Sequence, residues 1–301
     1  MLGCRTCKII QFLSPYLPGL FLVLHPMNKA FIITGLLAAL LLGACSKEYR
    51  NFSTLSRKGN LAEKDSAAFF FYKRGDYEKA SYLFEELRGA YRGTERAKTM
   101  LYHFAYCKYH TNLFSIAAYY FEEYVKQYPT DALTSECSYM IAYCFYLESA
   151  PYNLDQSANR KAMSQFQLFV NNYPYHEKVE ESNRLMTDLR ERLARKEFEE
   201  AKLYYKVENY KAAVTALSAM IQTYPDSRYR EEAQFLLFKS AVFLGDYSIA
   251  DKQKNRYLDA IELYQRFVDK YPSSVYVKEA EEYYLKAKKS LGKLTAEAEK
   301  S

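Results

Sequence analysis

The clearest pattern in the chain is a sixteen-residue frame of apolar and polar positions that can be laid on the sequence five times. The frames start at Tyr77, Phe114, Asn159, Tyr210 and Tyr257. In every frame the fourth residue is alanine and the fifteenth is tyrosine. Offsets of 3, 7, 10, 11 and 14, where nearly all residues are apolar or aromatic, form one stripe at 3.6 residues per turn. Each frame therefore predicts an amphipathic helix.

Four of the five frames end in the dipeptide Tyr-Pro, which predicts where the helix stops. A proline pushes the residue before it out of the helical region of backbone space. The four prolines are Pro129, Pro174, Pro225 and Pro272. The first frame differs, because it has Arg92 in the place of the proline and Gly89 and Gly93 nearby. We expect its local geometry to differ from that of the other four.

A second helical pattern precedes each frame, and a short turn such as Gly75-Asp76 joins the two. Each unit is therefore a helix, a tight turn and a second helix. Successive frames start 37, 45, 51 and 47 residues apart, more than the about 34 residues of a minimal tetratricopeptide repeat. The extra length is assigned to polar insertions at residues 151–159 and 248–256, and to a lengthened first helix over residues 177–207.

The spacing predicts how neighbouring units pack. A small residue stands eight positions beyond each proline: Cys137, Ser182, Ala233 and Ala280. A small side chain there lets the first helix of one unit approach the second helix of the unit before it. The predicted fold is all-α, a right-handed superhelix of five tetratricopeptide-like helix pairs over residues 61–291. Residues 276–291 are expected to form a C-terminal capping helix, and residues 292–301 a disordered tail.

The N-terminal region has the pattern of an export signal. Residues 1–26 are interpreted as a mispredicted extension, because Met27 starts a short basic region that is followed by an uncharged stretch from Ala30 to Ala44. That stretch is shorter than the about twenty residues of a membrane-spanning helix. Residues 27–44 therefore predict a signal peptide. Leu42-Gly43-Ala44-Cys45 resembles the bacterial lipobox, so we expect a covalent lipid on Cys45 and a flexible tether over residues 45–60.

Removing residues 1–44 changes the charge and the cysteine count. That segment holds three basic residues and no acid, so 42 minus 3 leaves 39 basic residues against 36 acidic ones, a net charge of +3. So small a charge argues against a nucleic-acid partner. Cys107, Cys137 and Cys144 remain besides the lipid-bearing residue. Cys137 and Cys144 are seven residues apart on one predicted helix, about 10 Å, too far for a disulfide. We expect all three to be small buried residues.

The sequence offers little catalytic chemistry. It has no glycine-rich phosphate loop, no Gly-x-Ser-x-Gly motif and no His-Glu-x-x-His motif. His103 and His110 share a predicted helix, but no third ligand accompanies them, so neither an enzyme nor a metal site is expected. The chain has 31 tyrosines, and most fall on the packing stripe. Four lie on predicted first helices and are candidate partner contacts on the concave surface: Tyr102, Tyr106, Tyr139 and Tyr143.

The lipobox cysteine, the short tether and five helix pairs ending in Tyr-Pro together resemble the BamD (YfiO) family of outer-membrane assembly lipoproteins. The resemblance covers residues 45–291. It implies an array anchored by lipid to the periplasmic face of the cell outer membrane. It also implies docking on the periplasmic domains of a BamA-type barrel protein, and help in folding and inserting unfolded outer-membrane β-barrel precursors. In some bacteria an aspartate directly after the lipid-bearing cysteine retains a lipoprotein in the inner membrane. This chain has Ser46 at that position, which agrees with an outer-membrane location.

A second interpretation stays open: another envelope tetratricopeptide lipoprotein, for cell-envelope coordination or for glycan or nutrient capture. Exposed tyrosines are typical platforms for sugars, but glycan-capturing proteins of this type are usually longer and rich in tryptophan. This chain has no tryptophan. A crosslinking pull-down from envelope membranes discriminates between the two interpretations, because only the assembly role predicts recovery of BamA.

Overall fold

The computed structural model describes residues 51–298, so the predicted signal peptide, Cys45 and the first 26 residues lie outside the described part. The chain divides into a unit ending at Glu63 and a second unit from Lys64 onward. Residues 51–58 of the first unit are helical, so the prediction of an irregular tether is wrong there. They contain no glycine or proline before Gly59. A reciprocal capping box then starts the next helix, because Asn60 and Glu63 each bond the backbone N–H of the other.

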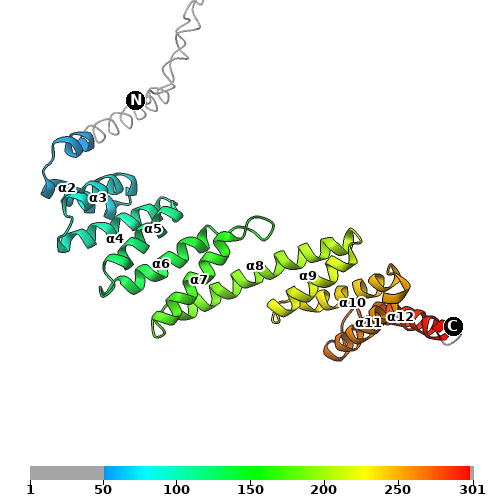
Figure 1. The fold of residues 1–301 in the computed structure, drawn as a ribbon. Coiled ribbons are helices and arrows are strands. Elements are labelled where there is room, and N and C mark those ends of the chain that lie inside the picture. Colours follow the sequence, from blue (N-terminus) through cyan, green and yellow to red (C-terminus); the bar gives the residue numbers. More distant parts are fainter. Residues whose placement is uncertain (1–50, 299–301) are drawn as a thin grey trace, which may run out of the picture. The chain divides into compact units, whose positions relative to one another are not determined.

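The described residues form helices and no strand (Figure 1). After residues 51–58 the helices are α2 (Leu61–Arg74), α3 (Tyr77–Ala90), α4 (Glu95–His110), α5 (Phe114–Gln127), α6 (Thr134–Leu147), α7 (Ser157–Asn172), α8 (Val179–Lys206), α9 (Tyr210–Thr223), α10 (Arg230–Asp246), α11 (Ala250–Lys270) and α12 (Val277–Ala298). From α3 onward, each helix packs on the next one in the chain. The predicted class, an all-α array of tetratricopeptide-like helix pairs, is confirmed.

The second helices of the pairs are α3, α5, α7, α9 and α11, and they bury the predicted stripe. The five alanines at the fourth position of the frame are 0% exposed: Ala80, Ala117, Ala162, Ala213 and Ala260. The small residues eight positions beyond the prolines are also fully buried. Large side chains fill the space between helices, and Phe84, Phe121 and Phe166 occupy the same position in successive units. The small residues let the helices approach closely, and the large side chains fill the remaining space, so the core is well packed.

The helix ends follow from the proline and from the turn residues. α5, α7, α9 and α11 all stop at the residue before the tyrosine of Tyr-Pro, as predicted. In three of the five pairs, one residue of the turn between the two helices has left-handed backbone geometry: Gly75 with φ 82°, Asn112 with φ 58° and Glu208 with φ 59°. Asp76 and Asn209 follow the turn and cap the next helix with a side-chain oxygen. The tight turn therefore makes the two helices of a pair antiparallel.

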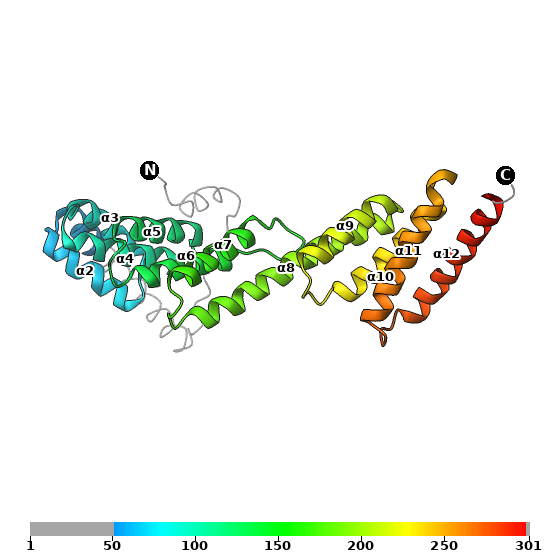
Figure 2. The same cartoon turned by 60° about the horizontal axis from the view of Figure 1, so that its bottom comes forward.

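Helix α8 is one long helix between α7 and α9 (Figure 2), and it takes part in two hydrophobic cores. One core spans Leu101 to Leu189 and takes the first half of α8, and the other spans Leu193 to Ala287 and takes the second half. The predicted lengthening of this helix is confirmed, since α8 has 28 residues. Helix α8 is therefore the continuous element that joins the two cores, which otherwise consist of different helices.

Two boundary predictions are wrong. Residues 250–256, assigned to a polar insertion, form the first two turns of α11, because they lack glycine and proline and tolerate a helix. The tail from Gly292 was expected to be disordered, but α12 continues to Ala298. Leu291 and Leu294 pack against the second core, which favours continued helix beyond the glycine. The capping helix is thus longer than its polar sequence indicated.

Candidate functional site

The four candidate tyrosines lie on two neighbouring first helices. Tyr102 and Tyr106 are on α4, with ring centroids 4.8 Å apart, and Tyr139 and Tyr143 are on α6, stacked at 5.6 Å. Tyr139 is only 6% exposed, so it belongs to the core and offers little surface to a partner, contrary to our expectation. Tyr102, Tyr106 and Tyr143 are half-buried. The structure thus brings the four rings onto adjacent helices and leaves three of them partly accessible.

Glu136 of α6 fixes the hydroxyl groups of the two α4 tyrosines. Tyr102 donates a hydrogen bond of 2.9 Å to Glu136 Oε1, and Tyr106 donates to the same oxygen. Burial, and then the hydrogen bond to Glu136, raises the pKa of Tyr102 and of Tyr106. Both phenols stay protonated and point at the next first helix. Their hydroxyls are therefore already used inside the chain, and a partner would meet the ring edges.

The Glu136 contact belongs to a series that repeats along the array. The third residue of α6, α8, α10 and α12 is a glutamate in every case: Glu136, Glu181, Glu232 and Glu279. Lys202 of α8 donates to Glu232 at 2.5 Å, and Lys239 of α10 donates to Glu279 at 2.6 Å. Glu181 lies beside Tyr139, and it adds to the effect of burial in raising the pKa of that phenol. We call these four residues the first-helix glutamates.

The sequence contains a signal for these contacts. Each first-helix glutamate stands seven residues beyond a Tyr-Pro proline, immediately before the small residue at the eighth position. The dipeptide reads Glu-Cys, Glu-Ser, Glu-Ala and Glu-Ala in successive units. An acid at such a fixed place beside a packing residue indicates a repeated polar contact between neighbouring first helices.

The first junction uses the opposite charges. The acid lies on the earlier helix, where Asp65 of α2 accepts two hydrogen bonds from Arg96 of α4, at 2.7 and 3.1 Å. Arg96 directly precedes Ala97, a buried small residue, so it takes the place that a glutamate has in later units. Tyr91 also donates to Asp65 at 3.2 Å. This junction therefore also has a hydrogen-bonded ion pair between neighbouring first helices, but here the acid is on the earlier helix and the donor is on the later one.

His103 and His110 belong to aromatic packing between the first two pairs. His110 stacks on Tyr77 with centroids 4.1 Å apart, and His103 meets Tyr72 edge-on at 4.9 Å. Burial lowers the pKa of both imidazoles, which favours the neutral rings. Among residues 51–298, no group of three or more histidine, cysteine or acidic side chains is placed to hold a metal ion. The imidazoles therefore act here as flat packing groups.

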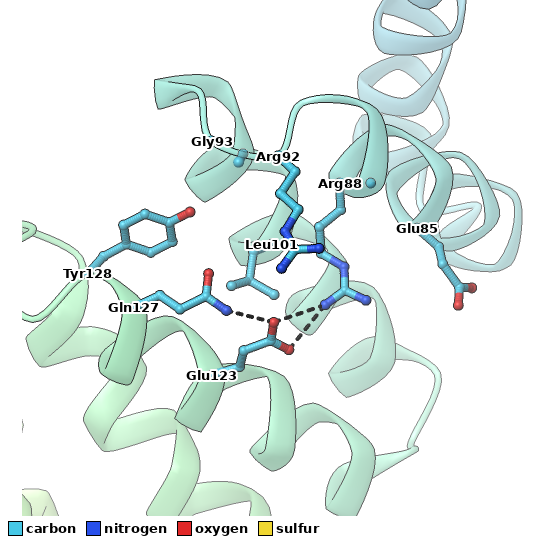
Figure 3. Close-up of a pocket in the computed structure, with 10 residues that line it drawn as sticks. Glu85, Arg88, Arg92, Gly93, Leu101, Glu123, Gln127 and Tyr128 are labelled. Carbon is cyan, nitrogen blue, oxygen red and sulfur yellow. Dashed lines mark hydrogen bonds and ion pairs between the residues drawn. The ribbon is translucent and has the colours of Figure 1, made fainter.

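A pocket of about 320 Å³ opens where the first frame departs from Tyr-Pro (Figure 3). Its wall comes from α3, α4, α5 and the turn between α3 and α4, including Gly89 and Gly93. Arg88 is paired with Glu123 at 3.1 Å, and Gln127 donates to the same carboxylate at 2.8 Å. Arg92 also lines the pocket (Figure 3). Gly89 and Gly93, close to the place where Arg92 replaces the proline, leave room for this polar hollow.

The three cysteines are buried and free, as predicted. Burial raises the pKa of the Cys107 and Cys144 thiols to about 12, far from the range of a reactive thiolate. No helix within residues 51–298 combines the length and the hydropathy needed to cross a membrane.

The fold and its repeated contacts define a tetratricopeptide-type repeat protein. A tetratricopeptide-repeat model matches residues 247–274, and the model of the YfiO family, described as outer membrane lipoprotein, matches residues 65–256. The chain therefore belongs to the YfiO outer membrane lipoprotein family.

Among curated relatives, outer membrane protein assembly factor BamD of Pasteurella multocida (strain Pm70) is 25% identical over 173 residues, which cover 54% of this chain. The protein of the same name from Xylella fastidiosa (strain 9a5c) is 22% identical over 199 residues, or 60% of this chain. The chain spans 66% of the length of each of these two relatives. A solved complex of the TPR2AB domain of yeast Sti1 is 16% identical, with a TM-score of 0.37, and covers 76% of this chain and 98% of that one.

Proposed function

We propose that this chain is a lipid-anchored scaffold that helps to assemble outer-membrane proteins at the periplasmic face of the outer membrane. One observation carries the proposal: the YfiO family match runs through residues 65–256, and relatives that cover much of the same array are named outer membrane protein assembly factors. The lipid on Cys45 would hold the array at the membrane. The role is one of binding and positioning, without catalysis.

The structure supports a binding role through the kind of surface it offers. A stacked array presents an extended face built from many helices, which suits large partners better than small ligands. On α4 and α6 that face carries half-buried aromatic rings that packing has already made rigid. Rigid aromatic side chains lose little conformational entropy on binding, so they make efficient contacts.

The proposed partners are a BamA-type barrel protein, through its periplasmic domains, and unfolded precursors of outer-membrane β-barrel proteins. The first would fix the array in an assembly complex, and the second would be its clients. Glycan capture gains no support, because Tyr102 and Tyr106 donate their hydroxyl hydrogens to Glu136 and Tyr139 is buried. A sugar platform needs such groups free for the ligand.

Depletion in the source bacterium, combined with a crosslinking pull-down from envelope membranes, tests the proposal. We expect depletion to lower the levels of several outer-membrane β-barrel proteins together, and the pull-down to recover BamA. Loss of another lipoprotein of similar size serves as the control for general envelope stress. Normal barrel-protein levels after depletion, with no BamA in the pull-down, would show that the assembly role is wrong.

A further inference from the structure

Two neighbouring turns of the last two helix pairs present apolar side chains to solvent. Val207 follows α8 and is 62% exposed, while Tyr247 and Ile249 lie between α10 and α11 and are 73% and 66% exposed. The turns are adjacent, because the ring of Tyr210 at the start of α9 stacks on Tyr247 at 5.7 Å. These three residues form an apolar tip on one edge of the array.

Exposed lysines surround this tip. Lys206 and Lys211 flank the first turn, and Lys252 and Lys254 follow the second. None of the four forms an ion pair within residues 51–298. We call the four lysines and the apolar tip together the basic apolar edge.

The acids near this edge do not cancel its charge. Asp246 is occupied, because it accepts from Tyr257 at 2.7 Å and pairs with Lys286 at 2.6 Å. Glu208 and Asp251 are the exposed acids of the two turns. Four lysines minus two acids leave a surplus of two positive charges around the apolar tip. The edge therefore complements a surface that is negatively charged outside and apolar below.

The second turn is held rigid, so the exposure of its apolar residues is a built feature. Arg256 donates to the carbonyl of Leu244 at 3.3 Å and to the hydroxyl of Ser248. Gly245 allows the close approach behind the turn, since a Cβ at that position would lie 2.8 Å from the ring of Tyr257. These hydrogen bonds turn the Ser248 side chain inward, and the side chains of its two neighbours, Tyr247 and Ile249, face the solvent.

On the opposite edge of the array, three cations are engaged with acids: Lys178 with Glu181 at 2.9 Å, Arg190 with Asp226 at 3.3 Å, and Arg228 with Glu191 at 3.6 Å. Val275 lies between α11 and α12 on that edge and is 86% exposed. It provides a matched apolar position outside the basic apolar edge.

We propose that the basic apolar edge binds the surface of a bilayer that contains anionic phospholipids. Val207, Tyr247 and Ile249 would enter the boundary between headgroups and acyl chains, where tyrosine and aliphatic side chains are favoured. The four lysines would contact the anionic headgroups. The array would then touch the membrane at a second place besides its lipid anchor. The inference rests on the outer-membrane location and is independent of the assembly role.

The full-length protein, reconstituted in vesicles of phosphatidylethanolamine with or without phosphatidylglycerol, tests the inference. A polarity-sensitive fluorophore is attached to Ile249→Cys or to the control Val275→Cys, and a spin-labelled lipid serves as quencher. Cys107, Cys137 and Cys144, the cysteines of the described residues, are buried, which keeps labelling selective there. We expect quenching at position 249 to exceed that at position 275 several-fold, only with phosphatidylglycerol present, and to fall at high salt.

Lys→Gln changes at positions 206, 211, 252 and 254 complete the test, because exposed neutral substitutions leave the fold intact. We expect each to weaken membrane engagement about fivefold, as read from quenching at position 249. Equal quenching at the two positions, or quenching that ignores lipid charge and the four lysines, would overturn the proposal. The proposal would also be overturned if the label at position 249 stayed in water when vesicles were added but became shielded from water when an acidic envelope protein was added. No assembly partner is present, so failure here leaves the assembly role standing.

Discussion

At the scale of single residues, this chain places acids where they connect neighbouring helices. Each first-helix glutamate sits in the first turn of its helix, where the positive end of the helix dipole favours a negative charge. It is therefore stabilised by its own helix as well as by the donor on the neighbouring one. The donor varies, from tyrosine in α4 to lysine in α8 and α10, because each only has to reach the same carboxylate.

Glu136→Ala tests the contribution of this contact. The change leaves the hydroxyls of Tyr102 and Tyr106 without their acceptor in a half-buried place, so we expect a loss of about 1–3 kcal/mol in the free energy of unfolding. Urea unfolding followed by circular dichroism measures it. Glu180→Ala is the control, because Glu180 is exposed in the first turn of α8 and should cost less than about 0.5 kcal/mol. Equal losses for the two variants would contradict the role given to Glu136.

Asp131 predicts a defined loss of stability in acid. The backbone N–H of Leu133, then Lys98 and Tyr124, lower the pKa of this carboxyl from 3.8 to about 2. Because the folded pKa is the lower one, the ionised side chain stabilises the fold above pH 3.8, and this stabilisation is lost as the pH falls toward 2. Asp131→Asn should therefore be less stable than the parent at neutral pH, and the difference should shrink between these two values. A pH-independent difference in urea midpoints would contradict this.

At the scale of elements, helix lengths are set by where a helix can still gain contacts. α11 begins at Ala250, although residues 250–256 are polar, because nothing in them breaks a helix. α12 passes Gly292 because Leu294 still reaches the second core. The helices of the frame end most regularly: α5, α7 and α9 stop before Tyr-Pro, and α3, which has Arg92 in place of the proline, stops at the same place in its frame.

Asn255→Pro tests whether the start of α11 is helical in solution. Proline there removes a helical hydrogen bond and clashes with the preceding turn, so we expect a cost of about 3 kcal/mol and a loss of helical signal. Ala250→Pro is the control. Position 250 is the first residue of the helix, and Ile249 before it is already extended, with ψ 147°. If both variants unfold at the same urea concentration as the parent, residues 250–256 are not helical.

At the scale of the whole unit from Lys64 onward, stability is carried by contacts between neighbours along the chain. The two cores share α8 and no other helix in their central clusters. In such arrays, damage to one unit spreads mainly to adjacent units. α8 is therefore the element through which one core can respond to the other, and its two halves belong to different cores.

Leu217→Ala tests this division. Leu217 is fully buried in the second core, so the truncation should cost about 2–5 kcal/mol. Hydrogen exchange read by mass spectrometry should show lower protection in α9, α10 and α11, with α4 and α5 unchanged. Leu168→Ala, at a 52% exposed position on α7, should alter neither region. Equal loss of protection in both cores would show that they unfold as one cooperative body.

The sequence by itself determined the class of fold and the phase of every repeat. Its signals are local: the 3.6-residue stripe, the alanine at the fourth position and the proline that stops the helix each act within one turn or one helix. For that reason the buried alanines and the ends of α5, α7 and α9 were predicted correctly. Cys137 and Cys144 were likewise correctly predicted to be buried.

Only the tertiary structure decided which side chains face a neighbour and which face solvent. Tyr139 and Tyr143 are one helical turn apart on α6, yet the first is buried and the second half-exposed, because Tyr139 meets Phe169 of α7 at 5.6 Å. The pairing of Glu136 with α4 and the meeting of two turns at Tyr210 and Tyr247 join residues over thirty positions apart. Such contacts depend on how helices stack, which no local pattern contains.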